Sequence, residues 1–384
     1  MKRPTLRIFE SGTSRKPHEP TAQDQSLREE PQGRTKLLRY ITRTTKAFLI
    51  IFFTLSLTDS FSQSKAAYES AFIEIHKMLK GESPLDFKRA VFLTENAYYS
   101  NKFDYKEFCK QIDNIEIKLN QFMRDKGVVN HVMGKQFAIF NYMMEPSKYN
   151  DNTRMNYDFE DLMGQKDRSK MFVTKLMNTK TGNCHSLPFL FKILSDEMKG
   201  ESYLALGPNH VYIKHKDDKG LWTNVELTNK SFPRDSWLIS SMSITTEAIK
   251  KETYMEPLSL RESIALCLYD LALEYKFQFG HDDFSLKCCN AAIEYFPKCI
   301  FAYMGKCDAL DKKRLALLKQ KKNQRTPEVL ELERKLTSLY DHIDGMGYKE
   351  MPKEEYEQWA KMIDKERKKQ EQAKANKTEK SNKK

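Results

Sequence analysis

Apolar side chains recur at three- and four-residue spacing through the first part of the chain, which is the period of an amphipathic helix. This spacing predicts helices from Lys65 to about Asp125, with Ser83 as an N-cap and Pro84 in the first turn of one of them. Gly127 breaks the pattern. Further helices are predicted over 128–144 and, after a polar and turn-rich stretch at 145–165, over 167–179.

Another helix is predicted after Cys184, in the stretch GNCHSLPFLF and beyond. Its apolar positions fall on one helical face: Leu187, Leu190, Phe191, Leu194 and Met198. Proline is tolerated only near the start of a helix, so Pro188 places Cys184 at the N-terminus of this helix. Gly200 is the expected C-terminal stop.

Three stretches of strand character follow, at 202–207, 210–216 and 221–229. The second and third alternate between apolar and polar residues, and Asp217 to Gly220 supplies a hairpin turn between them. A helix followed by antiparallel strands predicts an α+β fold class.

From about Ser259 the pattern returns to helices, at 268–280, 282–297 and 301–310. Gly280 ends the first of these helices, and Ala292 stands five residues before Pro297. This arrangement resembles a tetratricopeptide repeat, with one complete unit and a second, degenerate one. About three repeats are needed for a free-standing array, so these helices are expected to pack against the preceding domain.

A long charged helix from Leu315 to about Tyr340 is predicted to cap this helical region. Beyond Pro352 an amphipathic stretch leads into a charged tail that is predicted to be disordered.

The chain has 384 residues and a formal net charge of +12, which raises the question of nucleic-acid binding. The excess charge lies at the two ends: residues 1–62 carry a net +5, residues 361–384 a net +6, and the remainder +1. A nucleic-acid-binding domain concentrates basic side chains on a folded face. The distribution therefore argues against nucleic acid as a partner.

The N-terminal excess has the pattern of an export signal. Arg39, Arg43 and Lys46 precede an apolar run, AFLIIFFTLSL at 47–57, and small residues follow at 60–62. The run is shorter than the roughly 20 apolar residues that span a membrane. It predicts a signal peptide cleaved after residue 62, with an uncleaved signal anchor or a buried apolar helix as alternatives. The expected location is periplasmic or secreted, and membrane contact is expected only for an uncleaved anchor.

Seven cysteines are present, and five of them lie close together in the C-terminal half: Cys267, Cys288, Cys289, Cys299 and Cys307. Their spacing fits no zinc-binding pattern of paired C-x-x-C motifs. Cysteine is among the most buried residue types, so core packing is expected for these five, with one or two disulfides as the alternative in an oxidising compartment.

Cys184 differs from the other cysteines because a helix N-terminus lowers the pKa of a thiol and favours the nucleophilic thiolate. A nucleophile also needs a general base that a third polar group orients. His210, which begins a strand directly after the turn at 207–209, is the predicted base. On the next strand, Glu226 or Asn224 lies on the face that could hold its imidazole.

This order of residues resembles the transglutaminase-like superfamily of papain-like cysteine enzymes. The resemblance rests on GNCHSLPFLFKIL, GPNHVYIKH and WTNVELTN and covers about residues 150–240. It implies Cys184 as nucleophile, His210 as base and Glu226 as third member. The family usually has aspartate in the third place, and the papain signature C-G-[SA]-C-[WY] is absent. The joined helical repeats also resemble those of bacterial proteins that carry such a core.

Supporting roles are expected for Asn183, His185 and Asn224, and the Cys184 backbone N–H is the candidate oxyanion donor. A packed structural cysteine and histidine are the simplest alternative. A metal site would need His185, His210 and His215 beside the cysteine, but residues 210 and 215 lie five apart on one strand and so face opposite sides. No metal or cofactor is predicted.

These patterns divide the chain into a leader at 1–62, a helical segment at 63–145, a transglutaminase-like core at 146–250, a tetratricopeptide-like region at 251–345 and a tail at 346–384. The predicted function is an exported cysteine hydrolase or acyl transferase acting on an amide of a peptide or cell-wall substrate. The alternative is an inactive scaffold whose C-terminal helices bind a protein partner.

Overall fold

Four helices open the described part of the chain, which covers residues 63–350 and the tail positions 357, 361, 364, 365, 367–369 and 372 in a computed structural model. They run over residues 63–80, α2 (Phe87–Tyr98), α3 (Tyr105–Lys126) and α4 (Gly134–Met144). Gly127 ends α3 in the left-handed conformation, at φ 65°, as its position in the sequence predicted.

Two starts in this segment differ from the prediction. Asp86, not Ser83, caps α2, because its side chain accepts a hydrogen bond from the backbone N–H of Arg89. Residues 128–133 form turns, so α4 begins six residues later than expected, at Gly134.

The central part mixes short helices with two small sheets. In chain order its elements are η1 (Lys148–Asn150), β1 (Asn156–Tyr157), η2 (Arg168–Met171), α5 (Val173–Thr179), β2 (Thr181–Gly182), α6 (Ser186–Glu197), β3 (Tyr203–Gly207), β4 (His210–Lys216), β5 (Trp222–Val225), α7 (Asp235–Ser241) and α8 (Thr246–Lys250). The fold is therefore of mixed helix and sheet, in the α+β class.

The larger sheet is antiparallel in the order β3-β4-β5, as predicted. Gly207 pairs with His210 across a two-residue turn in which Asn209 adopts a left-handed φ of 52°. β5 is shorter than expected and ends at Val225. The backbone of the next residue, Glu226, pairs with Ser231 in an isolated antiparallel bridge and not with β4. The smaller sheet was not predicted: it is a parallel pair in which Tyr157 of β1 lies opposite Gly182 of β2.

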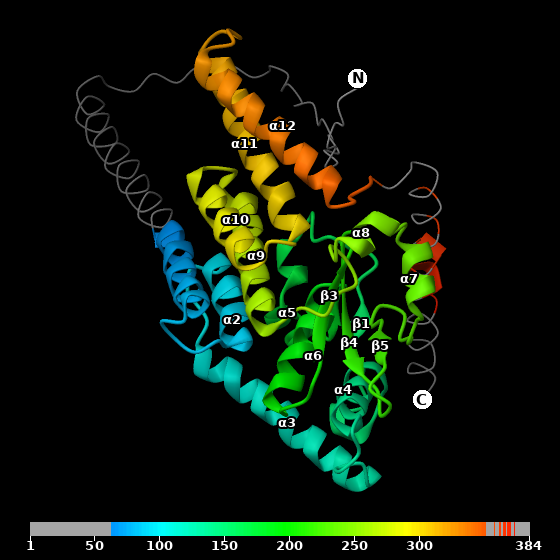
Figure 1. Cartoon of the computed structure of the whole chain (residues 1–384). Coiled ribbons are helices and arrows are strands. Elements are labelled where there is room, and N and C mark those ends of the chain that lie inside the picture. The colour runs from blue at the N-terminus through cyan, green and yellow to red at the C-terminus, as the bar shows by residue number, and fades with distance from the viewer. Residues whose placement is uncertain are drawn as a thin grey trace, which may run out of the picture. The chain divides into compact units, whose positions relative to one another are not determined.

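Four longer helices complete the described fold: α9 (Leu260–Phe279), α10 (Asp283–Tyr295), α11 (Ile300–Gln320) and α12 (Pro327–Gly345). Each packs on the next, and α9 also packs against α2 (Figure 1). The single helix predicted from Leu315 to Tyr340 is wrong, because the chain turns at 321–326 and Thr326 and Pro327 begin a new helix.

The first residues of the predicted tail, 346 and 347, pack against the fold. Met346 is buried, and the carbonyls of Met346 and Gly347 accept hydrogen bonds from the Thr253 and Thr245 hydroxyls, both at 2.7 Å. The described positions within 357–372 are helical, so disorder does not hold there.

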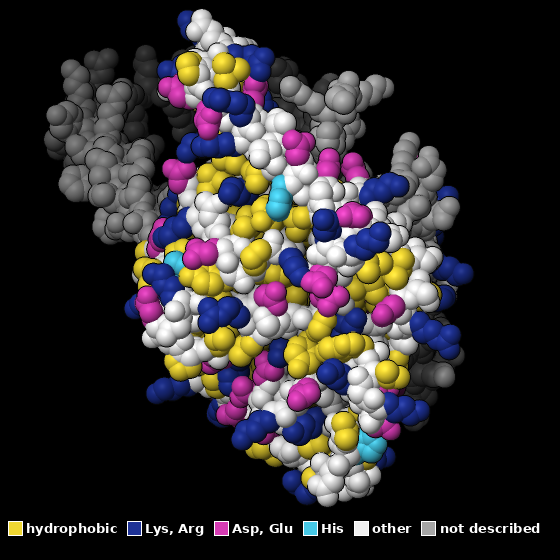
Figure 2. All heavy atoms as spheres, in the orientation of Figure 1, with side chains coloured by type: hydrophobic (Ala, Val, Ile, Leu, Met, Phe, Trp, Pro, Cys, Tyr) yellow, Lys and Arg dark blue, Asp and Glu magenta, His cyan; other side chains and the backbone are white. Residues whose placement is uncertain are grey.

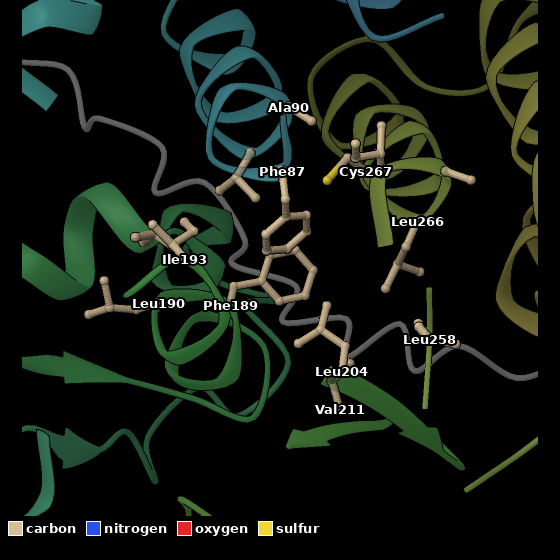
Figure 3. Packing of buried hydrophobic residues seen from close by; sticks show 14 of the residues in the cluster. Phe87, Ala90, Phe189, Leu190, Ile193, Leu204, Val211, Leu258, Leu266 and Cys267 are labelled. Carbon is tan, nitrogen blue, oxygen red and sulfur yellow. The ribbon is translucent and has the colours of Figure 1, made fainter. Parts of the chain in front are cut away.

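One cluster of buried apolar side chains extends from Ala67 to Met346 and joins the helical regions to the sheet. Figure 3 shows its centre, where Phe87 of α2 meets Phe189 of α6, with Leu266 and Cys267 of α9 close by. The two phenylalanine rings lie 5.3 Å apart between centroids. The N-terminal helices, α6 and the C-terminal helices therefore share a core.

Within the described ranges no helix is long and apolar enough to cross a membrane, and the predicted export signal lies outside these ranges. On the face shown in Figure 2, Lys and Arg side chains are interspersed with Asp and Glu side chains.

Candidate active site

Cys184 lies in the turn that leads into α6, and its neighbour Asn183 organises this turn. The Asn183 carbonyl accepts a hydrogen bond from the Leu187 N–H, and its side-chain oxygen accepts from the N–H groups of His185 and Ser186. This is the bonding of an N-cap residue, although regular helix begins only at Ser186. Cys184 therefore sits in the first turn of the helix, where free N–H groups and the helix dipole favour an anion.

His210 approaches Cys184 from the start of β4. Its Nε2 atom lies 2.5 Å from Oε2 of Glu226, and a second hydrogen bond joins its side chain to the Cys184 thiol. Because Nε2 is used by the carboxylate, Nδ1 is the nitrogen that remains for the sulfur. The three side chains thus form a chain of hydrogen bonds in the order cysteine, histidine, glutamate.

The imidazole and the carboxylate of this chain differ in exposure. The His210 side chain is 16% exposed, whereas that of Glu226 is 4% exposed and lies behind the imidazole. The other carboxylate oxygen of Glu226 accepts from the Thr228 N–H at 3.0 Å and from the Thr228 hydroxyl at 2.7 Å. Both oxygens of the buried carboxylate are therefore satisfied, and Thr228 fixes its orientation.

Tyr157 completes the surroundings of the sulfur. Its hydroxyl donates a hydrogen bond to the Cys184 sulfur and accepts one from the backbone N–H of Cys184. The short β1–β2 pairing positions it, because Tyr157 lies opposite Gly182, two residues before the cysteine. The sequence prediction missed this residue. The one signal for it is the alternation of Met155, Tyr157 and Phe159 with polar residues in a stretch otherwise typical of turns.

The electrostatics favour a charged thiolate–imidazolium pair. Burial works against ionisation of Cys184, but the hydrogen bond and charge of His210 outweigh it and lower the pKa of the thiol. Burial likewise opposes protonation of His210, yet the negative charge of Glu226 and the bond to the thiol raise the pKa of the imidazole well above its usual value. Against the penalty of its own burial, the charge of His210 lowers the pKa of Glu226.

No family model, curated protein or solved structure matches this chain.

The three predicted supporting residues lie in different places. Asn183 caps the turn at Cys184, as described above. His185 contacts α9, through its Nε2 atom 3.1 Å from Oδ2 of Asp270. Asn224 donates to the Pro233 carbonyl at 3.0 Å and to Asp235 at 2.7 Å, so of the two candidates for holding His210 it is Glu226 that does so.

A metal site gains no structural support in the described ranges, where no group of three or more His, Cys, Asp or Glu side chains is arranged to hold an ion. His215 bonds the Lys216 carbonyl instead. The five C-terminal cysteines are buried free thiols, as core packing predicted, and none forms a disulfide. Burial raises the pKa of each of these five thiols, which sets them apart from Cys184.

Taken together, the arrangement supplies a nucleophile, a base and an orienting carboxylate, with two N–H or O–H donors close to the sulfur. Such a set is suited to attack on a carbonyl carbon and to proton transfer to a leaving group.

Proposed function

We propose that this protein is a cysteine hydrolase of the transglutaminase-like type that cleaves an amide bond. The observation that carries the proposal is the hydrogen-bonded chain from Cys184 through His210 to Glu226. His210 in this chain lowers the pKa of the thiol, although burial acts in the opposite direction. A structural cysteine in an apolar setting would have its pKa raised, as the five C-terminal cysteines do.

The reaction follows from these roles. The Cys184 thiolate adds to the amide carbonyl carbon and forms a tetrahedral intermediate. The C–N bond then breaks while the His210 imidazolium gives its proton to the leaving amine, which leaves a thioester. His210, now neutral, takes a proton from water as the water attacks the thioester, and the acid and the free thiolate are released.

Negative charge develops on the carbonyl oxygen in both steps. The backbone N–H of Cys184 and the hydroxyl of Tyr157 lie close to the sulfur and are the donors placed to stabilise it. The pKa of Tyr157 is raised, chiefly by burial, so its phenol stays protonated and can donate.

Peptides and cell-wall cross-bridges are the proposed amide substrates, and export is the proposed route of the protein. Both proposals rest on the sequence: the export pattern at 39–62 and the resemblance described above. N-terminal sequencing of the protein recovered from outside the cytoplasm tests the second, with Gln63 as the expected first residue.

Thiol alkylation tests the core of the proposal. Iodoacetamide rates are measured between pH 8 and pH 6 by peptide mapping. Cys109 is the internal reference, because it is partly exposed and lies outside the buried set. A free thiol loses close to a hundredfold in rate over these two pH units, because its thiolate fraction falls about tenfold per unit. The Cys184 rate is expected to change far less.

A Cys184 rate that falls in parallel with the Cys109 rate contradicts the hydrolase. Release of a free amine from peptide substrates, compared between the wild type and Cys184→Ala, then tests the reaction itself. A partner that binds wild type and Cys184→Ala equally, with no amine released by either, would establish the inactive scaffold instead.

A further inference from the structure

The second histidine near the site, His185, lies between two hydrogen-bond acceptors. Its Nδ1 atom is 3.0 Å from the backbone carbonyl oxygen of Met171, and its Nε2 atom is 3.1 Å from Oδ2 of Asp270. The ring also stacks on Phe189, with 3.9 Å between the ring centroids. Its plane and position are thus fixed on three sides.

The chemistry of the two acceptors determines the protonation of the ring. A carbonyl oxygen can only accept, so Nδ1 must carry a hydrogen. An ionised carboxylate can also only accept, so Nε2 must carry one as well. A neutral imidazole has a single N–H, so donating to both of these partners at once takes an imidazolium cation. Burial opposes this charge, but the carboxylate of Asp270 outweighs it and raises the pKa of His185.

The carboxylate comes from the C-terminal helical region. Asp270 lies on α9, and Glu274, one turn further along the same helix, receives a hydrogen bond from Nε of Arg168 at 2.8 Å. From the other side, the Glu95 carboxylate of α2 accepts from the N–H groups of Val173 and Thr174 at the start of α5, at 2.6 Å and 2.9 Å. Helices α9 and α2 therefore both hold residues 168–174, the segment that precedes Cys184, through hydrogen bonds.

The charged groups that face His185 are Asp270, Arg168, Glu95 and Glu274. Of these four groups, Asp270 contacts the ring itself, with its Oδ2 atom 3.1 Å from Nε2 of His185. Arg168 repels the cation and is in turn paired with Glu274. The protonation of His185 consequently depends on the carboxylate of Asp270.

We propose that Asp270 is a positioning residue for the nucleophile: it holds His185 as a buried imidazolium, and through the adjoining peptide bond it fixes the Cys184 sulfur against His210. The cation next to the cysteine also favours the thiolate. On this proposal, which rests on the proposed hydrolase function, α9 is a part of the catalytic centre and the C-terminal helices are more than a separate binding module.

The test compares two neutral variants of the full-length protein, Asp270→Asn and Glu274→Gln. Both remove a buried carboxylate from the same face of α9, but Glu274 bonds Arg168 and not the His185 ring. Two quantities are measured: the pH profile of Cys184 alkylation, and the nitrogen NMR signals of the His185 ring, assigned by their loss in His185→Gln.

In the wild type both ring nitrogens of His185 are expected to be protonated at pH 7. In Asp270→Asn one nitrogen is expected to lose its proton, and alkylation of Cys184 at pH 6 to slow about tenfold, the effect of one pKa unit on the thiolate fraction. Glu274→Gln is expected to melt at a lower temperature but to keep the wild-type profile. Should Asp270→Asn fail to fold, His185→Gln is expected to show the same slowing.

A singly protonated wild-type ring overturns the proposal, and so does an Asp270→Asn protein that is folded and keeps the wild-type profile. Equal slowing in both variants overturns it as well, because the effect is then a general loosening of the buried charges. If the ring is doubly protonated but wild-type Cys184 reacts like a free thiol, the result contradicts the proposed hydrolase function. It still supports the proposal that Asp270 keeps His185 protonated.

Discussion

Replacement of Glu226 by glutamine is the sharpest single test of the candidate site. The change keeps the size and shape of the side chain and removes its charge. The glutamine oxygen can still accept from the N–H and hydroxyl of Thr228, so the local fold is expected to persist. What is lost is the ionic hydrogen bond to His210, whose atoms lie 2.5 Å apart in a buried setting.

A hydrogen bond to a charged group contributes about 1.5–3 kcal/mol, and one pKa unit corresponds to about 1.4 kcal/mol, so the pKa of His210 is expected to fall by about one to two units. A weaker imidazolium stabilises the Cys184 thiolate less, which raises the pKa of the thiol. The negative charge of Glu226 acts directly on the thiolate in the opposite sense, but this effect is smaller than that of His210. The pKa of the Cys184 thiol is therefore expected to rise by about one unit, the lower end of the range of one to two units.

Alkylation rates from pH 5 to pH 9 measure this shift. At pH 6 the rate of Glu226→Gln is expected to be about tenfold below that of the wild type, and the two curves are expected to converge toward pH 9, where both thiols are ionised. Asp235→Asn is the matched control, because this carboxylate contacts Asn224 on the same side of the sheet but not His210. A folded Glu226→Gln protein with the wild-type profile would refute the assignment of Glu226.

The remaining predictions concern the buried charges and thiols. Arg168→Met leaves Glu274 buried without its partner. At pH 8 the free energy of unfolding, measured with urea, is expected to fall by about 3–5 kcal/mol. At pH 5 the fall is expected to be smaller, because the pKa of Glu274 is raised to about 7 and the carboxylate takes up a proton. Burial raises the pKa of Glu95 from 4.5 to about 7, so its contribution to stability is complete below pH 4.5 and is lost as the pH rises through 7. Glu95→Gln lacks this loss. Between pH 4.5 and 8 the free energy of unfolding of Glu95→Gln is therefore expected to rise relative to that of the wild type by up to about 3 kcal/mol. An unchanged difference between the two proteins would contradict that reasoning. In the folded protein at pH 7, iodoacetamide is expected to leave the five buried C-terminal thiols unmodified, and in urea it is expected to modify all five. Mass spectrometry counts the modified thiols among Cys267, Cys288, Cys289, Cys299 and Cys307.

Local patterns in the sequence predicted most elements that the site uses. Pro188 marked the first turn of α6, and the turn at 207–209 marked the start of β4 at His210. Strand parity placed Glu226 and Asn224 on one face, and the structure then separates them: Glu226 reaches His210, whereas Asn224 bonds the segment that enters α7. Such choices depend on the path of the chain after the strand, which no periodic pattern encodes.

The parts that sequence could not supply are contacts between distant segments. Tyr157 reaches Cys184 through a strand pairing of only two residues, too short for an alternation pattern to be distinctive. Asp270 reads in the sequence as one more polar residue on a helix, and its role appears only when α9 packs against the turn at His185. The break between α11 and α12 was missed because the charged residues around it fit a continuous helix equally well.

The cost of burying these charges bears on whether the site is active. Replacing a buried ion pair by well-packed apolar side chains is often neutral or stabilising by about 1–4 kcal/mol, so a fold that needed only a stable core would gain nothing from such pairs. Here two buried histidine–carboxylate pairs, His210 with Glu226 and His185 with Asp270, converge on the turn that carries one cysteine. An inactive scaffold offers no reason for this convergence. On the two proposals above, one pair favours ionisation of the nucleophile and the other holds its turn in place, and together they favour the hydrolase.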